Sequence, residues 1–367
     1  MRELETCEIC HEDFAPEELV EFGGLWVCGA CFEGITVVCE RCGTRIWRED
    51  NAGDDDICLC RECFDDHYVR CSNCQRIIRD EDAYYGDDDT PMCFDCNQEY
   101  NSRYAVQAYG YKPSPVFYGT SERYLGVELE LDCGGESDQN ARTLMEIANS
   151  EEPHIYIKHD GSLDDGFEVV SHPMSLAYHL NTMPWAEVLT KARSLGYKSH
   201  QARTCGLHVH INRTAFGDTE KEQDAVIARI LFFFEKHWEE LLKFSRRTQR
   251  QVEQWANRYG YKDRPREILD HAKKSYSGVR YTAVNLTNAE TIEVRLFRGT
   301  LKYTSFVATL QLVNRICDCA VCLSDDEMKA MSWTTFAAGC TQHPELVQYL
   351  KERRLYVNDP VEVEAEV

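Results

Sequence analysis

The sequence predicts an α+β protein in which an antiparallel sheet, packed with helices, follows three small cysteine-rich modules. Cysteine is concentrated near one end, because 13 of the 19 cysteines fall between Cys7 and Cys96. Farther along, short segments alternate apolar and polar residues as half-buried strands do, and longer segments repeat apolar residues at helical spacing. We therefore expect modules over residues 1–98, a linker over 99–119, one large domain over 120–355 and an acidic tail over 356–367.

Charge is distributed unevenly along the chain. Residues 1–100 contain 8 Lys and Arg against 26 Asp and Glu, a net charge of −18 out of −23 for the whole chain. Such an acidic surface repels a phosphate backbone, so we expect the modules to bind protein rather than nucleic acid. The sequence shows neither a secretion signal after Met1 nor an apolar run of the roughly 18 residues that a membrane span requires. We expect a soluble, cytoplasmic protein without a membrane partner.

The cysteine-rich region contains six CxxC pairs, and each module reads CxxC, 17 or 18 residues, CxxC. The modules, at about 7–31, 39–63 and 71–96, recur every 32 residues or so. One CxxC turn places two thiolates on a metal ion, and two such turns complete the tetrahedral site of a structural zinc. We expect three zinc ions, with the ligands Cys7, Cys10, Cys28, Cys31, Cys39, Cys42, Cys60, Cys63, Cys71, Cys74, Cys93 and Cys96.

The spacing leaves part of the zinc ligation open. Pairing within a module and interleaved pairing between neighbouring modules both fit it. His11 and Cys58 are additional near-ligands, and Cys58 is an alternative to Cys60. The order of knuckle, hairpin, knuckle and helix resembles treble-clef and LIM-like zinc modules. Because modules of about 30 residues bury too little surface to fold alone, zinc, with apparent binding free energies of roughly 10–16 kcal/mol, is expected to act as their core.

Two segments of the large domain alternate as strands that carry metal-binding side chains on one face. The segment YLGVELELD places Glu128 and Glu130 opposite leucines and a valine. The segment GLHVHIN presents His208 and His210 on one side and apolar residues on the other. An acidic strand face alone is more typical of a solvated edge, so the interpretation depends on which strands lie beside it.

Two more segments supply further charged side chains. The segment TIEVRLFRG puts Glu293 and Arg295 on one side, and strict alternation turns Arg298 away from them unless the strand contains a bulge. The segment HDGSLDDGFEVV places Asp160 and Glu168 eight residues apart around a glycine-containing turn. Both of these acids are then able to point into one cavity.

If these segments line one face of a sheet, six candidate metal ligands converge. They are Glu128, Glu130, Asp160, Glu168, His208 and Glu293. So many buried acids cannot ionise together without compensating cations. Carboxylate oxygens with a single imidazole suit Mg²⁺ or Mn²⁺ better than zinc, and magnesium in such a site usually accompanies nucleotide phosphates, on which Arg295 would act.

Other candidates flank these strands. Apolar spacing predicts helices over 222–244, 305–323 and 344–354, and alternation predicts a strand over 276–288. Arg246 and Arg247 directly follow the first helix and are either a phosphate clamp or a plain surface turn. The segment before the last site strand adds Arg280 and Asn285 as weaker candidates for cofactor binding.

Four motifs, GVELE, KHDGSL with FEVVSHP, GLHVHIN and TIEVRLFRGTL, occur in this order over about residues 120–325. Together they resemble the amidoligase family of the glutamine synthetase and γ-glutamylcysteine ligase superfamily. The resemblance implies a glutamine synthetase-like fold, in which a curved antiparallel sheet forms a funnel. ATP would enter one side of the funnel and the carboxylate substrate the other.

The resemblance also implies roles for individual residues. Glu128 and Glu130 would bind different metal ions. His208 would be a metal ligand, while His210 would lie nearer the substrate or the phosphate. The acids spaced by eight and the ExR strand correspond to Asp160, Glu168, Glu293 and Arg295. An aspartate stands at position 160 where glutamine synthetases use glutamate, which shortens its reach toward a metal.

The activity implied is that of an ATP- and magnesium-dependent carboxylate–amine ligase, which forms an amide or isopeptide bond through an acyl-phosphate. Arg295, with Arg246, Arg247 and Arg298, would neutralise charge on the transferred phosphoryl group. The substrates would be a carboxylate and an amine, either small molecules or a protein or peptide recruited by the zinc modules. The residues leave three alternatives open: a metal-dependent hydrolase, a phosphotransferase, and a non-enzymatic zinc-module adaptor.

Overall fold

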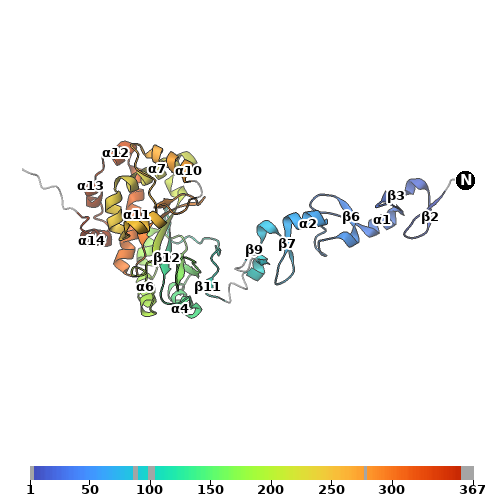
Figure 1. The fold of residues 1–367 in the computed structure, drawn as a ribbon, viewed down its shortest axis with the longest axis horizontal. Helices are drawn as coiled ribbons and strands as arrows, with labels where there is room; N and C mark the ends of the chain where they lie inside the picture. The colour runs from blue at the N-terminus through green and yellow to red at the C-terminus, as the bar shows by residue number, and fades with distance from the viewer. Residues whose placement is uncertain (1–3, 86–89, 98–103, 277–278, 357–367) are drawn as a thin grey trace, which may run out of the picture. The chain divides into compact units, whose positions relative to one another are not determined.

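The computed structural model describes residues 4–85, 90–97, 104–276 and 279–356. The chain divides into two compact units, Met1–Arg103 (unit 1) and Tyr104–Val367 (unit 2) (Figure 1). Unit 2 has one large core, and unit 1 has three small ones, one in each module.

Unit 1 is a series of short antiparallel hairpins and one-turn or two-turn helices. Its strands and helices are β1 (Glu5–Thr6), β2 (Asp13–Phe14), β3 (Leu19–Phe22), β4 (Leu25–Cys28), α1 (Gly29–Ile35), β5 (Thr36–Val38), β6 (Arg45–Trp47), α2 (Arg61–His67), β7 (Tyr68–Arg70), β8 (Ile77–Arg79), β9 (Tyr84–Tyr85) and β10 (Pro91–Met92). Each hairpin is too short to be stable alone. Cysteines make up two or three of the four buried residues in the core of each module.

The first CxxC pair of each module forms the same tight turn. The backbone N–H groups of His11, Gly43 and Gln75 donate to the carbonyl of the cysteine four residues earlier, at 2.9, 2.9 and 2.8 Å. All three residues have a left-handed backbone, with φ of 60°, 75° and 64°. Glycine adopts this conformation at the least cost, and the other two lie on the surface. His11, which the sequence suggested as an additional zinc ligand, is thus the residue that closes the turn of the first module.

The second CxxC pair begins a helix. Cys28 is the N-cap of α1 and Cys60 is the N-cap of α2, and each sulfur accepts the N–H of the residue three positions on at 3.5 Å. In each of the three cysteine groups found among the described residues, all four thiols belong to one module, an arrangement that fits sequential pairing. Cys58 lies outside its cluster, with Asn51 Nδ2 4.0 Å from its sulfur.

Unit 2 is built on a seven-stranded sheet with the order β11-β13-β14-β12-β15-β17-β16. Its strands are β11 (Val106–Gln107), β12 (Leu125–Leu131), β13 (Ile155–Lys158), β14 (Phe167–Ser171), β15 (Gly206–Asn212), β16 (Val284–Asn285) and β17 (Thr291–Arg298). Neighbouring strands are antiparallel, as predicted, except for the edge pair β11 and β13, which is parallel.

Helices pack against this sheet and against one another. They are α4 (Asp138–Ala148), α5 (Leu176–Asn181), α6 (Trp185–Ser194), α7 (Glu220–Lys236), α8 (Trp238–Ser245), α9 (Gln249–Trp255), α10 (Pro265–Ser275), α11 (Tyr303–Cys322), α12 (Asp325–Ala330), α13 (Trp333–Ala338) and α14 (Pro344–Glu352). The alternate residues Leu125, Val127 and Leu129 of β12 are fully buried in the same core as α7 and α11. The opposite face of β12 therefore carries its glutamates.

Helix α11 is long and apolar enough to cross a membrane by length and composition, which the sequence reading did not recognise. However, 72% of its apolar window is buried inside unit 2. Its apolar side chains therefore serve the core, as expected for a central helix that other elements surround.

The structure corrects three sequence expectations. Residues 104–119 are not a free linker, because β11 pairs with β13 and Tyr118 is buried in the core of unit 2. The helix predicted over 222–244 is divided into α7 and α8 at His237, whose ring packs against Phe233 and Trp333 with centroids 4.7 and 5.8 Å apart. The strand predicted over 276–288 is limited to β16 among the described residues. The predicted tail from 357 onward lies outside the described residues.

Candidate active site

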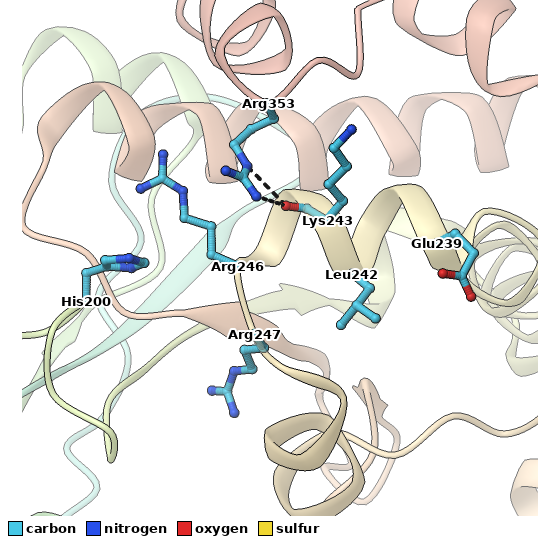
Figure 2. A pocket seen from close by; sticks show the side chains of 7 residues that line it. All are labelled: His200, Glu239, Leu242, Lys243, Arg246, Arg247 and Arg353. Atoms are coloured by element: carbon cyan, nitrogen blue, oxygen red, sulfur yellow. Dashed lines mark hydrogen bonds between the residues drawn. The ribbon is translucent and has the colours of Figure 1, made fainter.

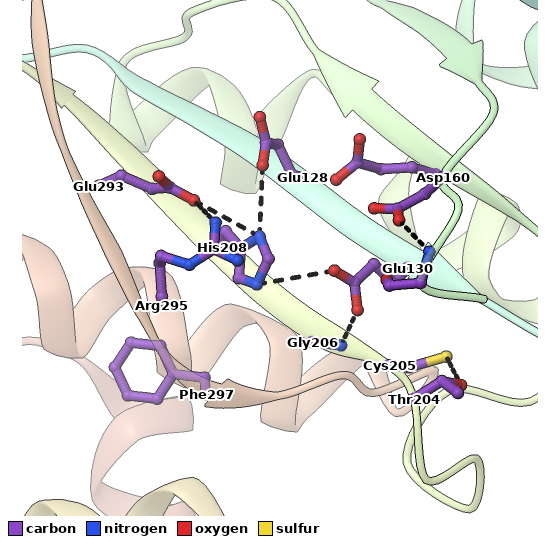
Figure 3. A network of polar contacts seen from close by, with 12 residues as sticks. Glu128, Glu130, Asp160, Thr204, Cys205, Gly206, His208, Glu293, Arg295 and Phe297 are labelled. Atoms are coloured by element: carbon purple, nitrogen blue, oxygen red, sulfur yellow. Dashed lines mark hydrogen bonds and ion pairs between the residues drawn. The ribbon is translucent and has the colours of Figure 1, made fainter. Parts of the chain in front are cut away.

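Four strands of unit 2 bring the predicted side chains together. The register creates three pairs of directly opposed residues, which are Glu128 with His208, Glu130 with Glu168, and His210 with Glu293. Opposed residues of antiparallel strands point to the same face, with Cβ atoms about 4.5–5.5 Å apart. Figure 3 shows acids and a histidine from β12, β15 and β17 turned toward one another.

Glu128 lies at the centre of this cluster. Its Oε2 is 3.2 Å from Nδ1 of His208, and its Oε1 is 3.1 Å from Nε2 of His210. Burial alone would raise the pKa of Glu128, but the charge of His210 and hydrogen bonds from both imidazoles hold it well below its usual value. Both carboxylate oxygens of one residue are thus engaged with a different histidine.

Glu293 forms the second acidic position of the cluster. Its Oε1 is 3.6 Å from His208 Nδ1 and pairs closely with Arg295, while its Oε2 accepts a hydrogen bond from Asn285 at 2.7 Å. Burial would raise the pKa of Glu293, yet the charges of His210 and His208 lower it. Asn285, a weak candidate in the sequence, is therefore part of the cluster.

Glu168 forms the third acidic position, and its partner was missed in the sequence. Lys158 Nζ is 3.2 Å from Glu168 Oε2, and both side chains are largely buried. Burial and the charge of Glu128 raise the pKa of Glu168 well above its usual value. Lys158 ends the alternating segment IYIK, so the same period-2 argument that found the acids would have placed it on their face.

Glu130 is held differently from the other acids. One of its oxygens, Oε2, accepts the backbone N–H of Gly206, and the other lies 3.7 Å from Nε2 of His208. A backbone donor therefore fixes half of this carboxylate. Glu130 faces the cluster as predicted, with one oxygen directed toward His208.

The arrangement fits a divalent cation at two points. The ligand atoms of Glu128, Glu168 and His208 all lie within 4.8 Å of one another, and so do those of Glu128, His210 and Glu293. We call these groups the Glu168 triad and the Glu293 triad. Carboxylate oxygens with one imidazole form a donor set that suits Mg²⁺ or Mn²⁺. Both histidines belong to a triad, and Glu128 is shared.

A bulge determines the position of Arg298. The register of β15 against β17 shifts between Leu207 and Val209, which oppose Phe297 and Val294, so β17 contains one extra residue. Arg298 then directly opposes Gly206 and returns to the face that carries His208. The sequence predicted that Arg298 would share this face only if the strand contained a bulge, and the bulge is present.

Arg247 lies at the edge of the cluster. A Cβ atom built on Gly206 would be 2.7 Å from Arg247 Nη2 and 2.7 Å from His208 Nε2, so the guanidinium and the imidazole share the space that glycine leaves free. The guanidinium also donates to the carbonyl of Phe297 at 3.1 Å. Burial lowers the pKa of Arg247 to about 10, and the charge of Glu130 opposes that shift.

Two predicted residues lie farther from the centre of the cluster. Asp160 is in the loop after β13, where it accepts the N–H of Ser162 at 2.8 Å, although its charge contributes to the raised pKa of Glu168. Arg280 is exposed and donates to the hydroxyl of Tyr109 at 2.6 Å. Neither side chain contacts the shared carboxylate of Glu128 through a hydrogen bond or ion pair that the described residues show.

Asp132, the last acid of the alternating segment, positions loops instead of joining the cluster. Its Oδ1 accepts the N–H groups of Cys133 and Asp165 at 2.7 and 2.8 Å, and its Oδ2 accepts from Asp164 N and Thr204 Oγ1 at 3.3 and 2.5 Å. Burial would raise the pKa of Asp132, but these hydrogen bonds lower it. The carboxylate thus ties two loops to the end of β12.

We expect Asp132→Asn to lower the free energy of unfolding of unit 2 by about 2–3 kcal/mol. The amide nitrogen of asparagine is a donor, so it cannot accept the hydrogen bonds that one carboxylate oxygen of Asp132 receives. Chemical denaturation followed by circular dichroism measures this change. Asp165→Asn is the matched control, because the side chain of Asp165 is exposed. Equal unfolding free energies for the two variants would contradict this role.

The three cysteine clusters of unit 1 are compatible with zinc. The sulfurs of each cluster lie within 4.8 Å of one another, and separations of 4.0, 3.8 and 3.7 Å join the two CxxC pairs in the successive modules. A tetrahedral zinc with Zn–S bonds of about 2.3 Å requires sulfurs about 3.8 Å apart. The donor type, number and spacing therefore all agree.

The thiols of each cluster also show why a cation is needed. Burial would raise the pKa of Cys7, Cys39 and Cys71, but backbone N–H groups lower it to about 6 in each case. A neighbouring thiol and burial raise the pKa of Cys31 and Cys63 to about 12. Four thiols so close together cannot all ionise without a positive ion among them.

The fold and the site define the class of unit 2. Acids and imidazoles converge on one sheet face, and arginines stand beside them, as in sites that bind divalent cations together with phosphate groups. A comparison with known protein families finds a match within unit 2. Residues 135–317 match the sequence model of the family described as "Putative amidoligase enzyme". The match begins after β12, so Glu128 and Glu130 are assigned from the sheet register instead.

Two solved structures align with 63% of the chain. One is a bifunctional glutathione synthetase from Pasteurella multocida, with 13% identity, a TM-score of 0.37 and 46% of that chain covered. The other is the complex between the prokaryotic ubiquitin-like protein Pup and its ligase PafA, with 11% identity, a TM-score of 0.30 and 58% covered. The chain thus spans about half the length of these proteins, and likenesses this distant carry no argument. No curated protein matches the chain.

Proposed function

We propose that unit 2 is an ATP- and magnesium-dependent carboxylate–amine ligase that forms an amide or isopeptide bond through an acyl-phosphate. The observation that carries the proposal is the convergence of two triads on the shared carboxylate of Glu128, with Arg295 and Arg247 beside them. The match to the amidoligase family supports the same reaction class.

The residues that would hold magnesium are those of the two triads, Glu128, Glu168, His208, His210 and Glu293. Bound there, magnesium would shield the charge of the ATP phosphates and favour attack at the γ-phosphorus. Glu130 would orient His208 from the far side, because its free oxygen faces Nε2 of that imidazole. This arrangement differs from the separate metal roles that the sequence resemblance implies for Glu128 and Glu130.

Arginines beside the triads would stabilise the transferred phosphoryl group. The Nε atoms of Arg247, Arg295 and Arg298 are buried and have no hydrogen-bond partner among the described residues. A buried guanidinium donor without a partner is costly unless a ligand accepts from it. Phosphoryl oxygens are strong acceptors for such donors, so nucleotide binding would complete these contacts.

The proposed reaction has two steps. A carboxylate oxygen of the first substrate attacks the γ-phosphorus of ATP, so the new P–O bond forms as ADP leaves. The amine nitrogen of the second substrate then attacks the acyl carbon, phosphate leaves, and the amine proton passes to solvent. No protein nucleophile is required. Burial raises the pKa of the Cys205 thiol, which keeps this nearby cysteine protonated and suited to packing.

A contact between segments at the two edges of the seven-stranded sheet supports the curved sheet that the family resemblance implies. Tyr109 follows β11 at one edge and Arg280 precedes β16 at the other, yet the Arg280 guanidinium is 2.6 Å from the Tyr109 hydroxyl. Lys158 Nζ also lies 5.6 Å from the centre of the Tyr109 ring. Curling of the sheet toward its acidic face would account for this contact between segments that flank its opposite edges.

We also propose that the zinc modules recruit a protein or peptide substrate. Their net charge of −18 over residues 1–100 and the exposed rings of Trp26, Tyr84 and Phe94 favour contact with a partner that is basic and partly aromatic or apolar. The amine-bearing substrate fits this description, because lysine-rich segments carry the amines that such a ligase would acylate.

Hydroxylamine trapping tests the proposed reaction without knowledge of the amine substrate. We expect the zinc-loaded protein, given ATP, magnesium and a panel of carboxylic acids, to form hydroxamates, because hydroxylamine intercepts acyl-phosphates. ADP release should accompany hydroxamate in equal amounts. ADP release with phosphorylated acceptor but no hydroxamate would instead indicate a phosphotransferase. Absence of magnesium-dependent ATP binding in calorimetry would overturn the proposed function.

A further inference from the structure

A basic cavity lies on unit 2 beside the acidic cluster. Its volume is about 690 Å³, and it is open to solvent. Its lining residues are His200, Glu239, Leu242, Lys243, Arg246, Arg247 and Arg353 (Figure 2). A smaller cavity shares His200 and Arg246 with it and adds Arg298. Lys243 and Arg353 come from segments that the sequence analysis treated as structural.

Among the described residues, no acid forms an ion pair with the lysine or the arginines that line this cavity. Arg353 donates to the carbonyl oxygen of Lys243 at 3.1 and 2.7 Å, and Arg246 lies over the ring of Tyr349 at 5.1 Å. These partners are neutral. The lining acid, Glu239, stands at the opposite end of the cavity from His200 in Figure 2. Glu352, whose pKa Arg246 helps to lower, is already paired with Lys302 at 3.0 Å.

Two further observations show that these cations crowd one another and that a buried donor among them has no partner within the described residues. The Nε atom of Arg246, a residue that lines both cavities, is buried and has no hydrogen-bond partner within the described residues. Burial, followed by the charges of Arg298, Arg246 and Arg353, lowers the pKa of His200. Unit 2 thus gathers several cations in a chain whose net charge is −23. Such a cluster is expected to bind an anion with more than one charged group.

We propose that this cavity binds an acidic peptide segment and anchors it so that a neighbouring carboxylate reaches the acidic cluster. Arg247 connects the two sites, because it lines the cavity and its Nη2 also borders Gly206 next to His208. The role as a substrate anchor rests on the proposed ligase function, whereas the binding of acidic peptide does not.

The lining favours carboxylates of a peptide over a nucleotide. Leu242 is the apolar member among the lining residues, and the other six carry charged or titratable groups. Several cations spread over about 690 Å³ match a chain with repeated carboxylates better than a single charged group. The ATP phosphates have their own partners at the triads, where magnesium would be held. The sequence assignment of Arg246 to ATP is therefore replaced, in this proposal, by a contact with the acidic substrate.

Fluorescence anisotropy with labelled hexaglutamate tests the proposal on the full zinc-loaded chain, in magnesium-free buffer without nucleotide. We expect wild type to bind hexaglutamate but not hexaglutamine, with affinity that falls as salt rises. The variant Lys243→Glu/Arg353→Gln should weaken binding of hexaglutamate at least tenfold. Lys221→Glu is the matched control, because Lys221 is exposed on α7 and does not line the cavity. Lys243→Glu alone, at an exposed side chain, serves if the double variant does not fold.

Calorimetry of the same proteins with magnesium and ATP separates the outcomes. The proposal requires the cavity variant to lose hexaglutamate binding and to keep the wild-type affinity for ATP. Loss of ATP affinity with unchanged hexaglutamate binding would make the cavity a phosphate site and overturn it. Failure of wild type to bind hexaglutamate, or equal binding by the cavity variant, would also overturn it. Cavity-dependent peptide binding without any ATP binding would uphold the peptide site and reject the ligase function.

Discussion

Glu128→Gln should abolish magnesium-dependent ATP binding and, with it, hydroxamate formation. Each carboxylate oxygen of Glu128 contacts a different histidine, and the residue belongs to both triads. Glutamine keeps the shape of the side chain but removes its charge and one acceptor. A single substitution therefore impairs both the Glu168 triad and the Glu293 triad. We expect the affinity for ATP in the presence of magnesium to fall about a hundredfold or more.

Calorimetric titration of ATP in the presence of magnesium measures this loss. Glu146→Gln is the matched control, because Glu146 is exposed on α4 and the substitution is chemically identical. Thermal unfolding should show that both variants fold. If Glu128→Gln binds ATP with the affinity of the control, the two triads are not the magnesium site and the mechanism proposed above is wrong.

Glu128→Gln also separates the proposed ligase from a non-enzymatic adaptor. An adaptor would bind protein through unit 1 without needing an intact acidic cluster in unit 2. The ligase needs Glu128 for every turnover, and retained hexaglutamate binding in this variant would show that only the cation points were lost. Binding of the acidic peptide and binding of ATP are thus separable properties of one domain.

The sheet and its acidic face were predictable because strand alternation is local. A period of two in YLGVELELD and GLHVHIN predicts which side chains share a face, and in TIEVRLFRG it does so as far as the bulge. The cysteine clusters were equally predictable, because CxxC spacing is a local property of one turn. Convergence of Glu128, His208 and Glu293 then required only that the strands be neighbours, which the register confirms.

Features that depend on contacts distant in sequence were not predictable. The side of Arg298 depends on a bulge in β17, where the register against β15 shifts. The basic cavity combines His200 with Arg353, which are separated by most of unit 2. The role of Asp132 depends on loop N–H groups that no periodicity describes. In each case tertiary packing decides what a charged side chain contacts.

Cys60→Ser should reduce bound zinc from three ions to two per chain and unfold the middle module of unit 1. The core of that module consists of Cys39, Leu59, Cys63 and Tyr68 with partly buried neighbours, which is too little apolar surface to replace the metal. Apparent zinc-binding free energies of roughly 10–16 kcal/mol exceed what such a core supplies. Metal analysis after dialysis and limited proteolysis of residues 39–63 measure the two effects.

Cys58→Ser provides the control, because Cys58 is two residues away and lies outside the cluster that contains Cys60. This variant should keep three zinc ions and wild-type resistance to protease. Loss of zinc in Cys58→Ser but not in Cys60→Ser would exchange the two ligands and contradict the described geometry. Unit 2 should unfold at the same temperature in both variants, because its buried core contains residues of unit 2 alone. Zinc is then needed only for the folding of unit 1, which we propose recruits the substrate, whereas ATP binding depends on unit 2.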